Sequence, residues 1–276
     1  MPTRREIIAR IETPLTALYG EREARQIARI VVMELGGLCL TDLVAEPDKE
    51  LGIDELDRII GELAAGRPLQ YVLGHTEFYG LDFQVREGVL IPRPETEELV
   101  RWIAESPAPD NPAVLDVGTG SGCIAVTLAL ENPLLTVTAT DVSSQALTVA
   151  RSNAQRLGAR IAFREGSWFD AVAPGARFDI IASNPPYIAD GDSHLPALSF
   201  EPTGALTSGP EGLDDIRVIA DQARRHLTDG GLLAFEHGFD QGKAARKLLA
   251  SLGYTAVVTV RDLGGNDRVT KGLFSC

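Results

Sequence analysis

Side chains that cross-link a protein or hold a metal are scarce in this chain of 276 residues. Its three cysteines form no Cys-x-x-Cys pair, and no two of its four histidines have metal-ligand spacing on one helix. An odd, scattered set of cysteines fits a reducing compartment better than a disulfide framework. We therefore expect a cytoplasmic protein without disulfides or a structural metal; the residues concerned are Cys39, Cys123, Cys276, His75, His194, His226 and His237.

Long apolar runs are also missing. Residues 1–15 lack the continuous apolar core of a secretory signal peptide, and the most apolar early stretch, residues 27–40, is interrupted by Arg29 and Glu34. A membrane-spanning helix needs about 20 predominantly apolar residues. We expect neither export nor insertion into a membrane.

The chain also has fewer basic than acidic side chains. The chain has 26 basic and 39 acidic side chains and a net charge of −13. Both residues 1–80, with nine basic and fourteen acidic side chains, and residues 81–276, with seventeen and twenty-five, are acidic. Such a chain repels a phosphate backbone at long range, so we expect no direct binding to nucleic acid, while a local basic patch stays possible.

The composition, 44% hydrophobic and 24% charged, is that of a globular protein with a substantial core. The first 70 residues have apolar side chains at three- and four-residue spacing, for example Ile7, Ile11 and Leu15, which predicts amphipathic helices. A further helix is expected over residues 53–65, and the alternating residues 78–91 predict a β-hairpin. The expected organisation is an all-helical domain (1–74), a hairpin linker (75–94) and a larger domain (95–276).

The larger domain shows short apolar runs that alternate with helical segments. Helices are expected at Cys123–Leu130, Ser144–Leu157, Asp214–Leu227 and residues 242–252. The alternation predicts an α/β fold with a doubly wound, seven-stranded, mostly parallel sheet and helices on both faces. The last strand should run antiparallel, because only residues 262–267 connect it to the strand before.

A glycine-rich loop, residues 118–122 (Gly-Thr-Gly-Ser-Gly), follows the first strand of this sheet. Glycines there let the backbone turn and approach a ligand, although the dinucleotide fingerprint would need glycine in place of Cys123. Asp141 ends the next strand, where a carboxylate can accept both hydroxyls of a ribose, and Trp168 could stack on an adenine. Together these features indicate a nucleoside-bearing ligand; the alternatives are a tight turn, a helix-capping aspartate and a core indole.

The fourth strand runs directly into an Asn-Pro-Pro-Tyr tetrapeptide, residues 184–187. The prolines hold the Asn184 side chain and the Pro185 carbonyl in a rigid turn. These two acceptors can orient a planar NH2 group, with the ring of Tyr187 against it. Orientation of this kind aims a weakly nucleophilic amide nitrogen at an electrophile without a general base. The alternative is a loop that its prolines merely stiffen.

The whole pattern resembles the class I S-adenosylmethionine-dependent methyltransferases, and within them the release-factor glutamine methyltransferase family, PrmC/HemK. The resemblance covers nearly the full chain, and the helical N-terminal domain and the PRPETE segment are its most specific parts. The matching motifs are GRPLQYVLG (66–74), VLIPRPETEELV (89–100), DVGTGSG (116–122), SNPPYI (183–188), FEP with a following AL (200–206) and RDLGGNDRV (261–269).

The resemblance implies N5-methylation of the glutamine in the Gly-Gly-Gln motif of class 1 peptide-chain release factors, with S-adenosylmethionine as cofactor. Residues 1–74 would recognise the release factor, and we expect a monomer. Ser167 stands where an acidic residue is common in the family, with Glu165 two positions earlier, and a contact of Ser167, of Glu165 or of neither with the adenine amino group stays open. The implied residues are Gly118, Thr119, Gly120, Ser121, Gly122, Asp141, Trp168 and Asn184 for the cofactor, Asn184, Pro185 and Tyr187 for catalysis, and Asn184, Pro185, Pro186 and Tyr187 for the substrate.

Two other functions fit part of this pattern. An adenine-N6 DNA methyltransferase also holds a planar NH2 group, but it must flip a base and bind duplex phosphates, for which the chain has no evident basic region. A catalytically silent cofactor-binding scaffold would have no use for an oriented amide acceptor. The helical domain could also be a simple stabilising cap, and we expect Glu236 and His237 to be ordinary strand-end and loop residues.

Overall fold

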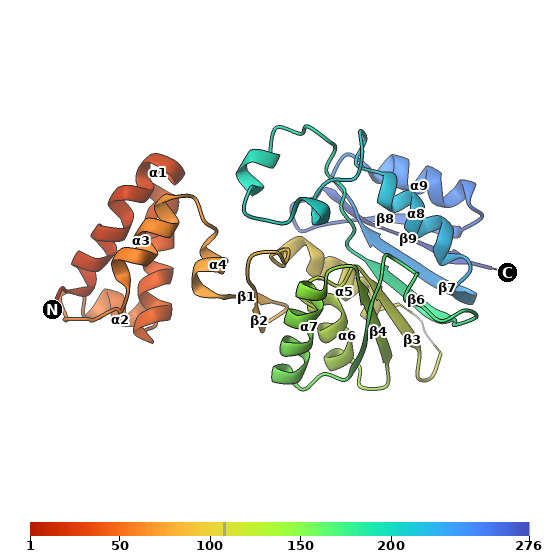
Figure 1. Ribbon diagram of the computed structural model, residues 1–276, viewed down its shortest axis with the longest axis horizontal. Helices are drawn as coiled ribbons and strands as arrows, with labels where there is room; N and C mark the ends of the chain where they lie inside the picture. The colour runs from red at the N-terminus through yellow and green to blue at the C-terminus, as the bar shows by residue number, and fades with distance from the viewer. Residues whose placement is uncertain (107–108, 276) are drawn as a thin grey trace. The chain divides into compact units, whose positions relative to one another are not determined.

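The computed structural model describes residues 1–106 and 109–275, which form two compact units (Figure 1). One unit is Met1–His75, and the other begins at Thr76. Cys276 lies outside the described residues, whereas Cys39 is exposed, Cys123 is buried, and both carry free thiols. In the described ranges, no helix is long and apolar enough to cross a membrane.

The first unit consists of helices, as its apolar spacing predicted. A capping box starts the first of them: Thr3 Oγ1 accepts the Glu6 N–H at 3.3 Å, and Glu6 Oε2 accepts the Thr3 N–H at 2.7 Å. Gly20, with φ 78° and ψ 164°, kinks this helix. The helices are α1 (Arg4–Gly36), α2 (Leu40–Ala45), α3 (Leu56–Ala64) and α4 (Leu69–Leu73).

These helices bury their apolar faces in a core of their own. Ile7, Ile11 and Leu15 are fully buried there, together with side chains of α3. Helix α3 begins at Leu56, three residues later than expected, and Asp57 in its first turn lies at the positive end of the helix dipole.

A short hairpin, β1 (His75–Phe78) and β2 (Leu81–Gln84), follows the helices. The expected hairpin is present, but it begins three residues and ends seven residues earlier than the expected residues 78–91. The chain turns at Tyr79 and Gly80, with φ of 53° and 70°, and positive φ at both central residues is typical of two-residue hairpin turns. Residues 85–93 are irregular and run on toward the second unit's helix α5.

The second unit is built on the predicted seven-stranded sheet, with strand order β5-β4-β3-β6-β7-β9-β8. The pairs from β5 to β7 are parallel, and β9 pairs antiparallel with both β7 and β8. Because β3 lies between β4 and β6, the chain reverses its direction of travel across the sheet at β3. The strands are β3 (Ala113–Val117), β4 (Thr136–Asp141), β5 (Ile161–Glu165), β6 (Phe178–Ser183), β7 (Leu227–Glu236), β8 (Thr255–Arg261) and β9 (Asp267–Phe274).

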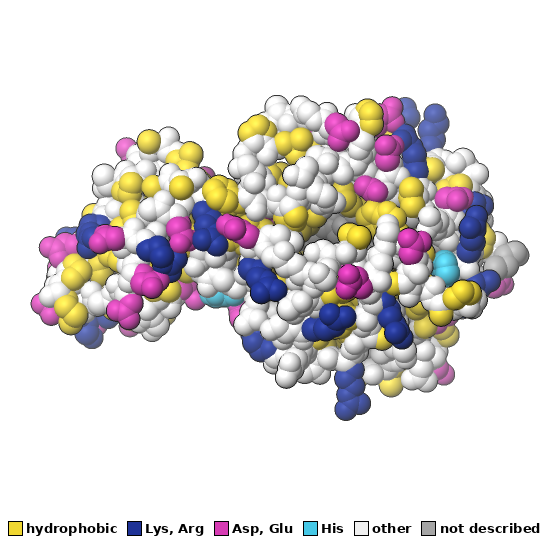
Figure 2. All heavy atoms as spheres, viewed as in Figure 1, with side chains coloured by type: hydrophobic (Ala, Val, Ile, Leu, Met, Phe, Trp, Pro, Cys, Tyr) yellow, Lys and Arg dark blue, Asp and Glu magenta, His cyan; other side chains and the backbone are white. Residues whose placement is uncertain are grey.

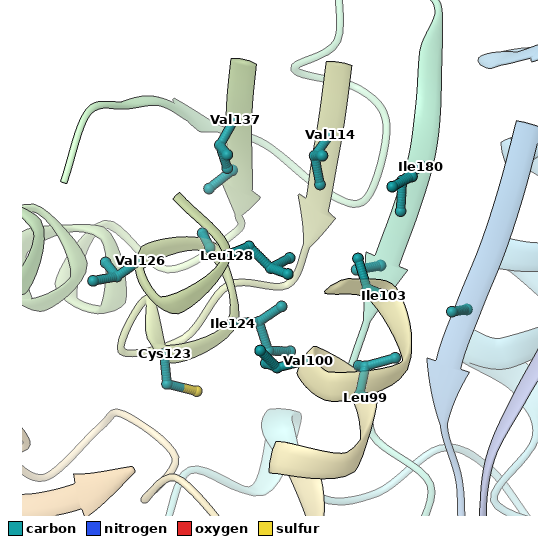
Figure 3. Packing of buried hydrophobic residues seen from close by; sticks show 14 of the residues in the cluster. Leu99, Val100, Ile103, Val114, Cys123, Ile124, Val126, Leu128, Val137 and Ile180 are labelled. Atoms are coloured by element: carbon teal, nitrogen blue, oxygen red, sulfur yellow. The ribbon is translucent and has the colours of Figure 1, made fainter. Parts of the chain in front are cut away.

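Helices cover both faces of this sheet, since successive strand residues point to opposite sides. Val114 belongs to the apolar cluster under α5, α6 and α7, whereas its neighbour Leu115 belongs to the cluster under α8 and α9. Figure 3 shows side chains of α5 and α6 directed at the first face. The helices are α5 (Glu97–Ala104), α6 (Cys123–Glu131), α7 (Ser144–Leu157), α8 (Asp214–Ala223), α9 (Gly242–Ser251), and the short 3-10 helices η1 (Pro94–Thr96), η2 (Leu195–Leu198) and η3 (Thr203–Ala205).

Candidate functional site

A cavity of about 290 Å³ opens in the second unit, at the carboxyl ends of β3, β4 and β6. This is where the reversal of strand order leaves a crevice in an open α/β sheet. Six segments that are distant in the sequence form its wall. The lining residues are 88–93, Thr96, 118–121, Cys123, Ile124, 141–143, Ala146, Ser167, Trp168, Asn184, Pro186, Pro202, Gly204 and Ala205.

The glycine loop lies at this cavity as predicted. Gly118, Gly120 and Gly122 have φ of 75°, 56° and 85°, a region that side chains rarely adopt. The Gly118 and Thr119 N–H groups both donate to the Thr140 carbonyl at 2.9 Å, which bends the chain out of β3. Gly122 is not among the lining residues; a Cβ there would lie 3.1 Å from Ala150 Cβ, so it permits close packing of α6 on α7.

The Asp141 carboxylate connects the loop to the neighbouring strand. Its Oδ2 accepts the Gly120 N–H and its Oδ1 accepts the Ser143 N–H, both at 2.8 Å. Burial raises the pKa of Asp141, and these backbone donors oppose that shift. Helix α7 is capped by the Ser143 hydroxyl rather than by Asp141. Each carboxylate oxygen therefore keeps acceptor capacity for a ligand hydroxyl.

Asp116, the first residue of the DVGTGSG motif, is a site residue that sequence analysis did not single out. It is fully buried, and its Oδ2 accepts the hydroxyl of Thr119 at 2.6 Å. Its Oδ1 has no hydrogen-bond partner in the described part of the chain. Burial raises the pKa of Asp116 to about 7, so this carboxyl changes its charge in the neutral range, directly behind the loop.

Trp168 contributes an indole to the cavity wall in an uncommon backbone conformation, with φ 45°. Its Cζ3 lies 3.4 Å from the point that a Cβ on Gly118 would occupy, which is van der Waals contact, so the positive φ of Gly118 rather than the ring favours glycine there. The indole is half-buried and also packs against the apolar cluster that contains the buried Phe169, so a place at the cavity and a place beside the core both hold for Trp168. Ser167 and Glu165 were the two candidates for contact with the adenine amino group. Ser167 lines the cavity, whereas Glu165 is not a lining residue.

The Asn-Pro-Pro-Tyr tetrapeptide follows β6 and forms a loop that backbone hydrogen bonds hold in place. Asn184 and Pro186 line the cavity, whereas Pro185 and Tyr187 do not. The N–H groups of Tyr187 and Ile188 donate to the Leu206 carbonyl at 3.2 and 2.9 Å, next to η3. In the ranges that the structure describes, no hydrogen bond reaches the Pro185 carbonyl.

Behind Asn184 lies a chain of hydrogen bonds that sequence analysis missed. Asn184 Nδ2 donates to Thr96 Oγ1 at 3.0 Å, and the Thr96 hydroxyl donates to Glu236 Oε2 at 2.6 Å. The Tyr187 hydroxyl donates to Glu236 Oε1 at 3.0 Å. Glu236 ends β7 as expected, but it is fully buried, and burial raises its pKa. The signal in the sequence is an acidic residue that directly follows the apolar run 232–235 of β7.

A partly buried ion pair joins two of the resemblance motifs beside the cavity. Arg93, in the PRPETE segment, pairs with Glu201, in FEP, and the other Glu201 oxygen accepts the Ile91 N–H at 3.1 Å. Glu201 is 6% exposed, so the contact is largely shielded from water. It holds the irregular segment after the hairpin against the segment that follows the tetrapeptide.

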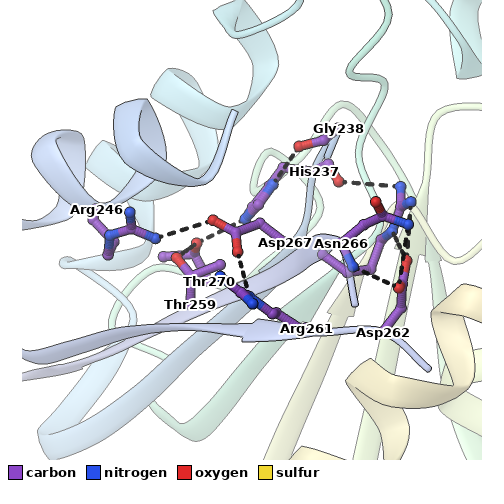
Figure 4. A network of polar contacts seen from close by, with 10 residues as sticks. His237, Gly238, Arg246, Thr259, Arg261, Asp262, Asn266, Asp267 and Thr270 are labelled. Carbon is purple, nitrogen blue, oxygen red and sulfur yellow. Dashed lines mark hydrogen bonds and ion pairs between the residues drawn. The ribbon is translucent and has the colours of Figure 1, made fainter. Parts of the chain in front are cut away.

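His237 has a structural place outside the cavity (Figure 4). Its Nδ1 lies 2.8 Å from the Gly238 carbonyl, and its Nε2 lies 2.8 Å from Thr270 Oγ1. Burial lowers the pKa of His237, so the ring is neutral and donates from Nδ1. Its role as a loop residue is the one that the sequence predicted.

Cys123 lines the cavity but is not a nucleophile. Burial raises the pKa of its thiol to about 12, and the neutral thiol is weakly reactive.

Comparisons with known proteins agree with this geometry. A family model described as "Methyltransferase small domain" matches residues 96–199, and one described as "PrmC N-terminal domain" matches residues 6–74. The release factor glutamine methyltransferase of Neisseria gonorrhoeae is 51% identical over 221 residues, which are 79% of this chain and 81% of that protein. The enzyme of the same name from Pseudomonas aeruginosa is 48% identical over 226 residues, 81% of this chain and 82% of that protein.

Solved structures support the fold alone. The chain is similar to a methyltransferase from Pyrococcus furiosus with a TM-score of 0.55 and 21% identity, over 72% of this chain and 91% of that one.

Proposed function

Because the chain belongs to the release factor glutamine methyltransferase family, we propose that it methylates the side-chain amide nitrogen of a glutamine in a class 1 peptide-chain release factor. The glutamine is the one in the Gly-Gly-Gln motif, and the product is N5-methylglutamine. The observation that carries this proposal is the position of Asn184, at the end of β6, in the same cavity as the glycine loop and Asp141.

The cavity fits S-adenosylmethionine, the cofactor of this class of enzymes. The left-handed glycines let backbone approach the ligand, Asp141 offers acceptors for the ribose hydroxyls, and Trp168 offers a flat face for the adenine. Thr119, Ser121 and Ser167 add hydroxyl groups to the wall. When bound, the cofactor supplies an electrophilic methyl group on a positively charged sulfur.

The residues of the tetrapeptide would orient the substrate. A glutamine amide has two N–H donors, and the Asn184 side-chain oxygen and the Pro185 carbonyl are two acceptors on one rigid turn. Bonding both hydrogens concentrates electron density on the nitrogen and aims it at the methyl group. Orientation can lower a barrier by up to roughly 7–11 kcal/mol. The Tyr187 ring would then pack against the amide plane.

We further propose that residues 1–74 recognise the release factor, and that residues 75–94 link them to the catalytic domain, 95–276. The helical unit has its own buried core, so it can present a surface without support from the catalytic core. The cytoplasm, where release factors act, is the proposed compartment, and a monomer is the proposed state. Acidic and basic side chains are interspersed over the face of the second unit seen in Figure 2, which suits a protein partner better than a DNA backbone.

The test is methyl transfer in vitro with labelled S-adenosylmethionine. Purified protein is incubated in parallel with a purified release factor, with the same factor after replacement of its Gly-Gly-Gln glutamine, and with duplex DNA. Mass spectrometry should find one methyl group on the glutamine-containing peptide of the first substrate alone. Label on DNA with an untouched peptide would establish the adenine methyltransferase instead, and cofactor binding without transfer to any substrate would establish a scaffold.

A further inference from the structure

The carboxamide of Asn184 has a defined orientation, because its nitrogen can only donate a hydrogen bond. Nδ2 lies 3.0 Å from Thr96 Oγ1, so the hydroxyl oxygen of Thr96 is the acceptor. Within the described part of the chain, no donor reaches Asn184 Oδ1. The oxygen is thus the end of the amide that stays available to a ligand in the cavity.

The Thr96 hydroxyl can accept this bond only if its own hydrogen points elsewhere. That hydrogen goes to Glu236 Oε2, at 2.6 Å, and a carboxylate cannot donate back. Thr96 is 1% exposed and Glu236 is fully buried, so water does not compete for either contact. The direction of each bond from Glu236 to Asn184 therefore follows from the charge on Glu236.

The second carboxylate oxygen of Glu236 also accepts a hydrogen bond. The Tyr187 hydroxyl donates to Oε1 at 3.0 Å, so both oxygens act as acceptors. Burial raises the pKa of Glu236 and Glu95 adds to this rise, whereas the two hydroxyl donors and the charge of Arg268 lower the pKa and favour the ionised form. One buried carboxylate thus constrains both the asparagine and the tyrosine of the tetrapeptide.

We propose that Thr96 and Glu236 are positioning residues that hold the Asn184 oxygen toward the nitrogen that is methylated. If the carboxamide turned over, its NH2 group would face the NH2 group of the glutamine, and two donors cannot bond each other. Neither positioning residue need touch the reacting atoms. The inference rests on the proposed glutamine methylation, which supplies the NH2 group to be oriented.

The first test compares Thr96→Val, which removes the hydroxyl at nearly constant volume, with Thr96→Ser, which keeps it. For Thr96→Val we expect kcat on a release factor to fall on the order of 100-fold, while the Kd for S-adenosylmethionine stays within about threefold. Thr96→Ser should keep kcat within about fivefold of the wild type. A Thr96→Val enzyme that retains full kcat would overturn the inference, and so would a Thr96→Ser enzyme that loses as much as Thr96→Val.

A double-mutant cycle asks whether the two residues act through one path. Glu236→Gln places a donor where one acceptor is needed and should also lower kcat. The combined Thr96→Val and Glu236→Gln variant should be no slower than Glu236→Gln alone, because Glu236→Gln already removes the contact through which Thr96 acts. Losses that multiply would show independent roles and refute the relay. Glu236→Gln alone serves if Thr96→Val does not fold, as judged by thermal unfolding.

A readout without turnover separates this inference from the proposed function. In the nitrogen-15 NMR spectrum, the Asn184 side-chain NH2 pair, identified by its loss in Asn184→Ala, should exchange slowly with solvent in the wild type and faster in Thr96→Val. If the wild type methylates no release factor, the proposed function fails, and this measurement still decides on the relay. Equal exchange in the two proteins would contradict it.

Discussion

The Asp141 carboxylate accepts the Gly120 N–H at 2.8 Å, so the acid at the end of β4 holds the loop that follows β3. Asp141→Ala removes this contact and the proposed acceptor for the ribose. A hydrogen bond to a charged group contributes about 1.5–3 kcal/mol, so the Kd for S-adenosylmethionine should rise on the order of 10- to 100-fold in calorimetric titrations. Asp170→Asn, which removes an exposed charge near the same end of the sheet, is the control and should bind as the wild type does. Equal affinities for Asp141→Ala and the control would show that Asp141 has no part in the site.

Asn184→Ala should separate cofactor binding from turnover. We expect binding of S-adenosylmethionine to remain measurable, while kcat falls on the order of 100- to 1,000-fold, as when one oriented dipole is removed from an active site. Asn184→Asp is a stricter variant, because the shape is kept but the donor to Thr96 is replaced by a second acceptor. The kcat of Asn184→Asp should be nearly as low as that of Asn184→Ala. Turnover by either variant at the wild-type rate would remove Asn184 from the mechanism.

Much of the fold could be predicted because it depends on local patterns. Helix α7 occupies the predicted residues 144–157, since polar and apolar side chains alternate at helical spacing between Ser143 and a left-handed Gly158. The helix expected to end at Leu227 stops at Ala223, because Leu227 begins a buried strand. The hairpin was misplaced because its turn, Tyr-Gly, lacks the usual Asn-Gly or Asp-Gly sequence.

The predicted site was incomplete for a different reason. The glycine loop, Asp141, Trp168 and Asn184 each follow a strand, so the sheet brings them to one edge. The bond between Thr96 and Glu236 joins residues 140 positions apart, and that between Asn184 and Thr96 spans 88. No periodicity or spacing in a single sequence indicates contacts of this kind.

Gly212 leaves no room for a side chain beside the tetrapeptide. A Cβ at Gly212 would lie 2.2 Å from the Tyr187 carbonyl oxygen, and its φ is 67°. Gly212→Ala should lower the free energy of unfolding by about 1–3 kcal/mol from overpacking, with about 1–2 kcal/mol more from the left-handed backbone. It should also lower kcat by displacing the loop that carries Asn184.

Gly61→Ala provides the matched control for that substitution. Gly61 lies inside α3 with open space around its Cα, so alanine should stabilise the protein by about 0.5–1 kcal/mol. Chemical denaturation measures both variants. A Gly212→Ala protein as stable and active as Gly61→Ala would show that the loop can move without cost.

Binding of S-adenosylmethionine should release protons near neutral pH. Burial raises the pKa of Asp116 to about 7, so the free protein carries both the neutral acid and the carboxylate near neutral pH. Asp116 supports the glycine loop through its hydrogen bond with Thr119. A cation that binds against this loop favours the charged carboxylate and lowers the pKa of Asp116. Affinity should therefore rise as the pH increases through the neutral range, with release of a fraction of a proton on binding. Calorimetric titration in two buffers of different ionisation enthalpy measures the release directly, and Asp116→Asn should abolish it. Identical proton release by the wild type and by Asp116→Asn would assign the linkage to another group.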